Sequence, residues 1–321
     1  NMNANEVIAN LALIELGEMP GNYAALHPNN DVNMSQSTND VYPTALRLAT
    51  IFATYKLIAA LGRLADSFAS KGRQFSDILK IGRTQLQDAV PMTLGQEFHA
   101  YAITIREDMA RLTEALSLLR EVNLGGTAIG TGINTDPAYT DIVIARLSDI
   151  SGEGIKRSEN LVEATSDTGA FVMFSGVLKR TAIKLSKIAS DLRLLSSGPR
   201  AGFGEINLPA VQAGSSIMPG KVNPVIPEVV NQAAYLVVGY DVTISMCAEG
   251  GQLQLNAFEP TIGFAIAQGQ RLLTNACDTL RERCVDGITA NRERCNELVM
   301  NSVGIVTVLV PVLGYEKCSE L

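Results

Sequence analysis

Residues 94–122 read L-G-Q-E-F-H-A-Y-A-I-T-I-R-E-D-M-A-R-L-T-E-A-L-S-L-L-R-E-V, and this stretch decides the fold class. Its large apolar residues recur mostly at steps of three and four: Leu94, Phe98, Ile105, Met109, Leu112, Leu116, Leu119 and Val122. Side chains at that spacing lie on one face of an α-helix. The stretch is therefore predicted to be a long helix that buries an apolar stripe in a core or a subunit interface and ends at Gly125-Gly126.

Similar helical segments recur on both sides of this stretch, and no alternating strand pattern of any length is found. Helices are predicted over residues 7–16, 45–68, 137–151, 170–195, 228–247, 262–283 and 291–301. At 1.5 Å per residue, a helix of 26 residues is about 39 Å long, a length typical of helix bundles. The sequence predicts an all-α fold, a bundle of about five long helices.

The composition narrows the classes of partner. Hydrophobic residues make up 46% of the 321 residues and charged residues only 18%, which predicts that some helix faces are buried against other subunits. The net charge of −7 argues against nucleic acid and against an anionic membrane surface. The longest apolar run, residues 303–315, is broken by Pro311 and is shorter than the roughly 18 residues that span a bilayer.

The cysteines and histidines predict no metal site. The five cysteines include no C-x-x-C pair, and His27 and His99 lie far from them in sequence. An odd number of unpaired cysteines is typical of a reduced protein with buried thiols. A cytoplasmic protein without metal or cofactor is expected.

Polar segments separate the predicted helices. Residues 35–40, S-Q-S-T-N-D, precede the helix over 45–68 and are residues that favour N-caps. Capping alone is one interpretation; the other adds anion binding at the positive helix N-terminus. Residues 82–95, G-R-T-Q-L-Q-D-A-V-P-M-T-L-G, are predicted to be a second polar loop. Residues 125–132, G-G-T-A-I-G-T-G, lack the Lys-Ser/Thr ending of a phosphate loop, so a tight turn is expected there.

A third polar segment, residues 213–224, reads A-G-S-S-I-M-P-G-K-V-N-P. Its glycines and prolines exclude a helix or a central strand and predict a loop that can approach a ligand closely. Ser215 and Ser216 offer hydroxyls, Lys221 a positive charge, and Asn223 both a donor and an acceptor. These groups suit a small, multiply anionic substrate; the alternative is a polar surface loop.

Three of these segments resemble signature segments of the aspartase/fumarase superfamily: residues 37–40, 82–97 and 214–224. The last matches every defined position of G-S-S-x-M-P-x-K-x-N-P, and residues 125–134 and 197–200 also fit. The resemblance extends over nearly the whole chain. Within the superfamily the chain is more similar to aspartases, because fumarases typically carry Ser-Ser-Asn in place of Ser37-Thr38-Asn39 and His in place of Gln85. Some aspartases also carry that His.

The resemblance implies an ammonia-lyase that reversibly eliminates ammonia from L-aspartate to give fumarate, without a cofactor. It implies a homotetramer with a central bundle of twenty helices and active sites that are each shared by three subunits. It gives Ser215 as the base that removes the Cβ proton, and it assigns the substrate contacts to Ser37, Thr38 and Ser216 (β-carboxylate), Lys221, Asn223 and Thr84 (α-carboxylate), and Asn39, Thr84 and Gln85 (amino group). Glu228 matches an acidic position that pairs with the His of relatives; with Gln85 here, a structural hydrogen bond is expected. Arg83 and Asp88 are candidates for structural ion pairs.

The resemblance also implies a domain division. Residues 1–37 are expected to be the remnant of an N-terminal domain, 38–290 the central helical domain, and 291–321 the start of a C-terminal domain. Relatives carry more chain at both ends, so one hypothesis is an intact constellation with reduced activity. The alternatives are a fumarase-like hydro-lyase and a catalytically impaired helical core retained as an assembly module.

Overall fold

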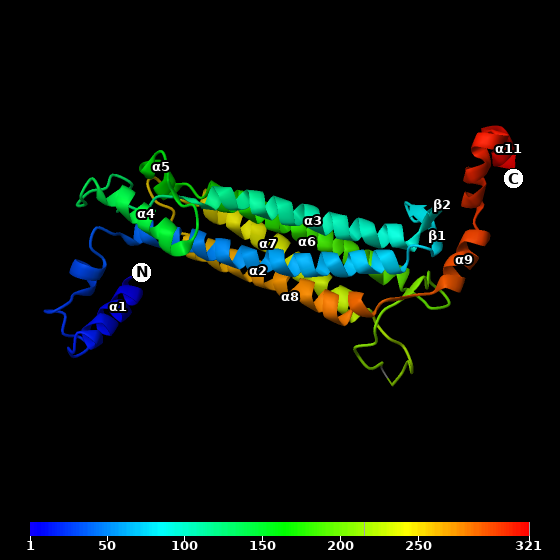
Figure 1. The fold of residues 1–321 in the computed structure, drawn as a ribbon, viewed down its shortest axis with the longest axis horizontal. Coiled ribbons are helices and arrows are strands. Elements are labelled where there is room, and N and C mark those ends of the chain that lie inside the picture. Colours follow the sequence, from blue (N-terminus) through cyan, green and yellow to red (C-terminus); the bar gives the residue numbers. More distant parts are fainter. Residues whose placement is uncertain (215, 321) are drawn as a thin grey trace. The chain divides into compact units, whose positions relative to one another are not determined.

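Five long helices dominate the computed structural model, which describes residues 1–214 and 216–320 (Figure 1). They contain 25 to 37 residues each: α2 (Thr38–Gln74), α3 (Leu94–Leu119), α6 (Gly169–Leu195), α7 (Val225–Glu249) and α8 (Glu259–Arg283). The prediction of an all-α fold built on about five long helices is confirmed. The spacing of apolar residues explains this success, because every member of the predicted α3 stripe except Met109 is buried.

Contacts divide the chain into two units, each of which contains a segment of all five long helices. The first unit comprises Asn1–Tyr55, Leu112–Val177 and Gly239–Gln268; the second comprises Lys56–Arg111, Leu178–Val238 and Gly269–Leu321. The predicted domain boundaries after residues 37 and 290 are a different kind of division, and they stay a prediction.

The first unit adds short elements to its helix segments. These are α1 (Met2–Glu15), the π-helix η1 (Pro28–Val32), α4 (Tyr139–Ser151), α5 (Leu161–Ser166), and the parallel strands β3 (Glu121–Val122) and β4 (Lys156–Arg157). Val122, Leu124, Ile144 and Ile155 form a buried cluster among them. Helix α3 ends at Leu119, before the predicted Gly125-Gly126, because residues 121 and 122 pair with β4.

The second unit adds a β-hairpin and further short elements. The hairpin consists of β1 (Leu79–Thr84) and β2 (Gln87–Thr93), and β1 packs against α9 (Arg292–Met300) (Figure 1). The remaining elements are β5 (Ile206–Asn207) paired with β6 (Thr289–Ala290), η2 (Val285–Gly287), η3 (Val303–Leu309), α10 (Val310–Leu313) and α11 (Tyr315–Glu320). Aromatic rings fill its core; Phe75 and Phe98 meet edge to face with centroids 5.2 Å apart.

The prediction of a strand-free loop over residues 82–95 was wrong for most of that segment. Residues 79–84 and 87–93 pair as antiparallel strands from Leu79↔Thr93 to Thr84↔Gln87. Both are edge strands of a two-stranded sheet, where a proline such as Pro91 is tolerated. Only residues 80–82 are buried in this hairpin, so it lacks the alternation that reveals a strand in a sequence.

No segment was expected to be long and apolar enough to span a membrane, but helix α2 is. Among the described residues it is long and apolar enough to cross a membrane, and Arg292–Met300 with Val303–Leu313 would pass only as one span bent by 70°. However, 44% of the most apolar window of α2 is buried within the chain, and the core helix of a bundle passes the same test. The absence of a membrane partner stays a prediction.

Candidate active site

The N-terminus of α2 is held by a reciprocal capping box. The Ser37 hydroxyl accepts a hydrogen bond from the Asn39 N–H at 3.2 Å, and the Asp40 carboxylate accepts one from the Ser37 N–H at 3.0 Å. This arrangement satisfies two backbone donors that a helix start would leave unpaired. The capping interpretation of residues 37–40 is therefore confirmed, while anion binding there stays a prediction.

Asp40 also fastens the helix start to the glycine-rich turn after β3. Its second carboxylate oxygen accepts hydrogen bonds from the N–H groups of Gly125 at 3.1 Å and Thr127 at 2.9 Å. The side chain is fully buried, and this burial raises the pKa of the Asp40 carboxyl despite the backbone donors. A Cβ at Gly125 would lie 2.3 Å from the hydroxyl oxygen of Thr140. Residues 125–132 are thus a tight, close-packed turn, as predicted.

Pro43 explains a further contact at the same helix start. Proline has no N–H, so the carbonyl of Asn39, four residues earlier, loses its partner within the helix. The Asn123 side chain donates a hydrogen bond to that carbonyl at 3.0 Å instead. The Asn39 side chain in turn donates to the carbonyl of Ala128 at 2.8 Å. This contact fixes the Asn39 amide and leaves its oxygen without a hydrogen bond among the described residues.

Thr84 and Gln85 lie at the turn of the β1–β2 hairpin. The pair Thr84↔Gln87 encloses a two-residue turn in which Gln85 and Leu86 have φ values of 54° and 61°. Left-handed backbone at two non-glycine residues costs roughly 1 kcal/mol or more at each, and such strain is concentrated at functional sites. Both predicted site residues are exposed, so this turn presents them to solvent.

The signature segment forms the loop predicted for it, as far as residues 213–214 and 216–224 show; Ser215 lies outside the described residues. A Cβ at Gly214 would lie 2.5 Å from the Lys221 carbonyl oxygen, so only glycine allows the two ends of the loop to approach this closely. Gly220 has φ +78°, a conformation that favours glycine. Ser216 is exposed.

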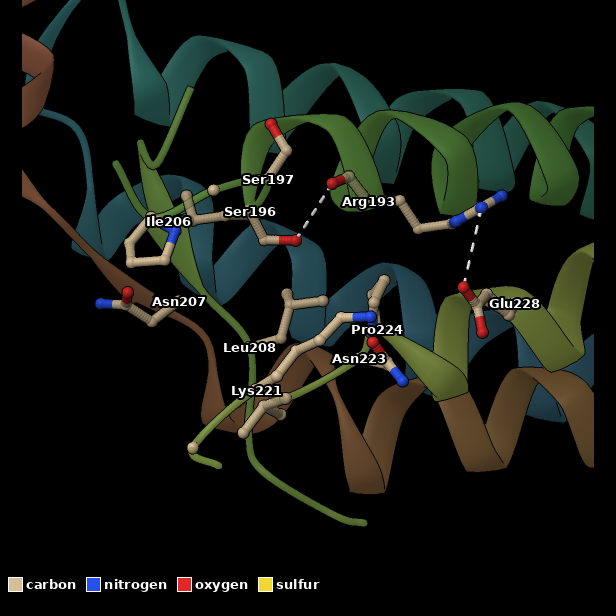
Figure 2. A pocket seen from close by; sticks show the side chains of 14 residues that line it. Arg193, Ser196, Ser197, Ile206, Asn207, Leu208, Lys221, Asn223, Pro224 and Glu228 are labelled. Atoms are coloured by element: carbon tan, nitrogen blue, oxygen red, sulfur yellow. Dashed lines mark hydrogen bonds and ion pairs between the residues drawn. The ribbon is translucent and has the colours of Figure 1, made fainter. Parts of the chain in front are cut away.

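A pocket of about 530 Å³ lies beside this loop (Figure 2). Its lining includes Lys221 and Asn223 from the loop, Arg193 and Ser196 from the end of α6 and the turn after it, and Glu228 from the first turn of α7. The Arg193 guanidinium lies 3.7 Å from the Glu228 carboxylate and donates a hydrogen bond to the side-chain oxygen of Asn231 at 3.2 Å. Two cations, two amides and the Glu228 carboxylate therefore line one cavity, and since the cations outnumber the anion the combination suits a carboxylate ligand.

The structure brings only some of the predicted residues together. Lys221 and Asn223 share the pocket, and Thr84 and Gln85 are not part of its lining. Ser37, Thr38 and Asn39 belong to the first unit, whereas the second unit contains Thr84, Gln85, Ser216, Lys221 and Asn223. The sequence analysis did not single out Arg193. Its position could have indicated a site, because it is a cation in the last turn of a helix and lies three residues before a Ser-Ser-Gly-Pro turn.

Glu228 was expected to have a structural role. Its partner in the structure is Arg193 and not Gln85. Arg83 is in an ion pair with Glu205 at 2.7 Å, as expected of a structural charge, and Asp88 lies opposite Arg83 in the hairpin. Among the described residues no group of three or more His, Cys, Asp or Glu side chains is placed to hold a metal ion.

Comparison with known proteins identifies the family. A family model described as "Lyase" matches residues 1–239. The chain is 63% identical to aspartate ammonia-lyase from Pseudomonas canavaninivorans over 100% of its length, covering 68% of that relative. It is 56% identical to the enzymes from Helicobacter pylori (strain ATCC 700392 / 26695) and Escherichia coli (strain K12), covering 69% and 66% of them. The chain belongs to the aspartate ammonia-lyase family.

Solved structures of lyases share the fold of this chain. A fumarate lyase:delta crystallin from Brucella melitensis, in a crystal structure bound to cobalt, superposes with a TM-score of 0.96 at 64% identity, over 99% of this chain and 69% of that one. Recombinant class II fumarase from Schistosoma mansoni superposes with a TM-score of 0.94 but at only 34% identity, over 99% and 70% of the two chains. The chain is thus an enzyme of the lyase class, and its 34% identity to the fumarase is lower than its identities of 63% and 56% to aspartate ammonia-lyases.

Proposed function

We propose that this member of the family catalyses the reversible elimination of ammonia from L-aspartate to give fumarate. The observation that carries the proposal is the identity of 56–63% to curated aspartate ammonia-lyases over the whole chain. The 34% identity to a class II fumarase makes a hydro-lyase the weaker alternative. The pocket beside the signature loop supports an anionic substrate, because Lys221, Asn223 and Arg193 face it.

The reaction requires a base that can remove the weakly acidic Cβ proton of aspartate. A base removes a proton from Cβ of aspartate, and the electron pair moves onto the β-carboxylate, which becomes a doubly negative aci-carboxylate. That pair then forms the double bond as the C–N bond breaks and ammonia leaves. Preorganised donors that stabilise the extra charge make such a step feasible.

Ser215 is proposed as the base, since the signature loop supplies what a serine alkoxide needs: a glycine-rich backbone whose N–H groups can face the oxygen, and the nearby cation Lys221. Ser37, Thr38 and Ser216 are proposed to hold the β-carboxylate and its aci-carboxylate form. The Ser37 oxygen accepts the capping hydrogen bond, so its hydrogen is available for donation.

Lys221, Asn223 and Thr84 are proposed to hold the α-carboxylate. Asn39, with Thr84 and Gln85, is proposed to contact the amino group. The support for Asn39 is chemical: its amide nitrogen already donates to Ala128, and the remaining oxygen is an acceptor that matches an ammonium. Gln85 offers an amide that cannot relay a proton, so Glu228 is assigned a structural role.

We propose that the active enzyme is a cytoplasmic homotetramer in which three subunits build each site. Helix α7 supports the assembly with four apolar side chains that are 45% to 61% exposed: Val229, Leu236, Val242 and Met246. Exposed apolar side chains on a helix are typical of subunit interfaces.

The test is an assay of fumarate by ultraviolet absorbance with L-aspartate and, separately, with L-malate. Fumarate from aspartate alone is expected. Fumarate from malate alone would favour the hydro-lyase, and none from either would favour the assembly module. Ser215→Ala should abolish turnover without changing the tetramer in analytical ultracentrifugation, whereas Ser117→Ala, an exposed serine on α3, should change neither.

Subunit mixing tests the shared site. Ser215→Ala protein should be inactive and Thr84→Ala protein should keep only a small but measurable activity. After exchange of subunits the mixture should regain about a quarter of wild-type activity, because a site that draws these two side chains from different subunits has an even chance at each position. A mixture that regains no activity after demonstrated exchange would show that one subunit supplies both groups.

A further inference from the structure

Four charged side chains form a cluster beside the β1–β2 hairpin, with Lys80 and Glu205 buried and Arg83 and Glu97 partly exposed. Lys80 Nζ lies 2.6 Å from a Glu97 carboxylate oxygen and 2.8 Å from Oε2 of Glu205, and Arg83 donates to Oε1 of Glu205 at 2.7 Å. The side chains of Lys80 and Glu205 are 2% and 0% exposed. The two cations and two anions balance, and such a cluster is expensive to bury unless all its members are paired.

The position of this cluster follows from an irregularity in β1. Lys80 and Arg83 are three residues apart, and in a regular strand residues three apart point to opposite faces of the sheet. The register with β2 shifts between Ile81 and Arg83, which is the behaviour of a β-bulge. The bulge brings Lys80 and Arg83 to the same side, where each reaches a different oxygen of the Glu205 carboxylate.

Glu205 is itself fixed. Its N–H donates to the carbonyl of Leu195 at the end of α6, and its carbonyl accepts from the N–H of Asn291, both at 2.9 Å. Phe203, two residues earlier, lies under the Arg83 guanidinium, 4.1 Å from the ring centroid. The backbone of Glu205 is thus held in place by hydrogen bonds. Its side chain holds the bulge through Arg83, which is 122 residues away in sequence.

The turn that follows the bulge depends on this anchor. Thr84 is the next residue after Arg83, and the strained residue Gln85 follows, with left-handed backbone at Gln85 and Leu86. Strained backbone persists only where its surroundings determine it. The β2 side supplies a close contact, since a Cβ at Gly82 would lie 3.0 Å from the Val90 carbonyl oxygen, and the β1 side supplies the ion pairs to Glu205.

We propose that Glu205 is a positioning residue of the lyase reaction: by holding Lys80 and Arg83 it locks the β1 bulge and thereby sets where Thr84 and Gln85 stand toward the substrate. This inference rests on the proposed aspartate chemistry, in which Thr84 and Gln85 contact the substrate. Glu205 does not touch the substrate and acts through the hairpin turn.

A double-mutant cycle distinguishes positioning from plain stabilisation. In full-length protein, Glu205→Gln should lower kcat/KM for aspartate at least 10-fold, mainly through KM. In a Thr84→Ala/Gln85→Ala background, the same substitution should cost less than 3-fold, because the groups it positions are gone. Equal factors in both backgrounds would overturn the proposal. Asp278→Asn, which breaks an exposed ion pair with Arg63 in the same unit, is the control and should change kcat/KM less than 2-fold in either background.

Two further measurements keep the test decisive. Arg83→Lys, which retains the charge but loses the planar guanidinium over Phe203, should give the same non-additive pattern if Glu205→Gln folds poorly. Hydrogen exchange requires no activity: Glu205→Gln should speed exchange of the residue 83–88 amides at least 10-fold and leave α7 and α8 unchanged. Unchanged or uniformly faster exchange overturns the inference. If the wild type is inactive on aspartate but Glu205→Gln gives the expected exchange pattern, the proposed substrate is refuted. The conclusion that Glu205 holds the hairpin turn then still stands.

Discussion

Replacement of Asp40 by alanine is expected to lower the free energy of unfolding by about 3–6 kcal/mol. The buried Asp40 carboxylate accepts hydrogen bonds from the N–H groups of Ser37, Gly125 and Thr127. A buried donor left without a partner costs about 1–3 kcal/mol, and the bonds to Gly125 and Thr127 are both buried. Loss of the capping bond to Ser37 adds about 1 kcal/mol. Relief of the cost of burying a charge offsets part of this sum.

Urea unfolding followed by circular dichroism measures the effect, at fixed protein concentration because assembly shifts apparent stability. Asp40→Asn retains one acceptor oxygen and removes the charge, so it should cost about half as much. Asp141→Ala is the control, since its carboxylate is exposed and pairs with the exposed Arg157 at 3.2 Å; a change within about 0.5 kcal/mol is expected. Values for Asp40→Ala and Asp141→Ala that agree within 1 kcal/mol would refute the argument that the carboxylate joins the helix start to the turn.

Three further substitutions test other parts of the chain. Burial raises the pKa of Glu259 from 4.5 to about 7, so the wild type loses stability as the pH rises through this range, and Glu259→Gln should not. In urea unfolding, the stability of the wild type relative to the variant should therefore fall by about 3 kcal/mol between pH 4 and pH 8. Gly130→Ala should lower the melting temperature and cost at least about 2 kcal/mol, because a Cβ would lie 2.3 Å from the Leu161 carbonyl oxygen at φ +88°. Lys221→Met should raise KM for aspartate in initial-rate assays by about 10- to 100-fold, the value of a charged hydrogen bond.

The long helices could be predicted from the sequence because their stabilisation is local and periodic. In α3 the apolar residues recur at helical spacing, and Leu94, Phe98 and Leu112 are fully buried. The start of α2 was also predictable in kind, since Ser37 and Asp40 are good capping residues. The extent of α2 was not, because Pro43 ordinarily argues against a helix, and its cost is offset by Asn123, which is distant in sequence.

The hairpin was not predictable because, like the start of α2, it depends on a residue that is distant in sequence. Its strands are short edge strands without alternation, and the carboxylate that holds them, Glu205, lies 122 residues from Arg83 in sequence. A sequence shows charges but not which of them are paired across such a distance. Hydroxyls, a lysine and amides in polar segments suit an anionic substrate, and the assignment of these residues to a site stays a prediction. The division of these residues between two units, and the contribution of Arg193 to the pocket, required the structure.

At two places in the chain, a residue proposed to contact the substrate lies next to a residue that holds the backbone. Substrate contact and backbone support are thus assigned to different side chains. Asp40 fastens the start of α2, and at the neighbouring Asn39 the side-chain nitrogen is engaged by Ala128 while the oxygen has no hydrogen bond among the described residues. Arg83 and its partner Glu205 fasten β1, and Thr84 is exposed at the next position. Backbone positions fixed by a neighbour need no contribution from the reactive side chain, whose hydrogen-bonding capacity remains for a ligand. Substitution of Glu205 should therefore change stability and kcat/KM together, and substitution of the exposed Thr84 should change kcat/KM alone.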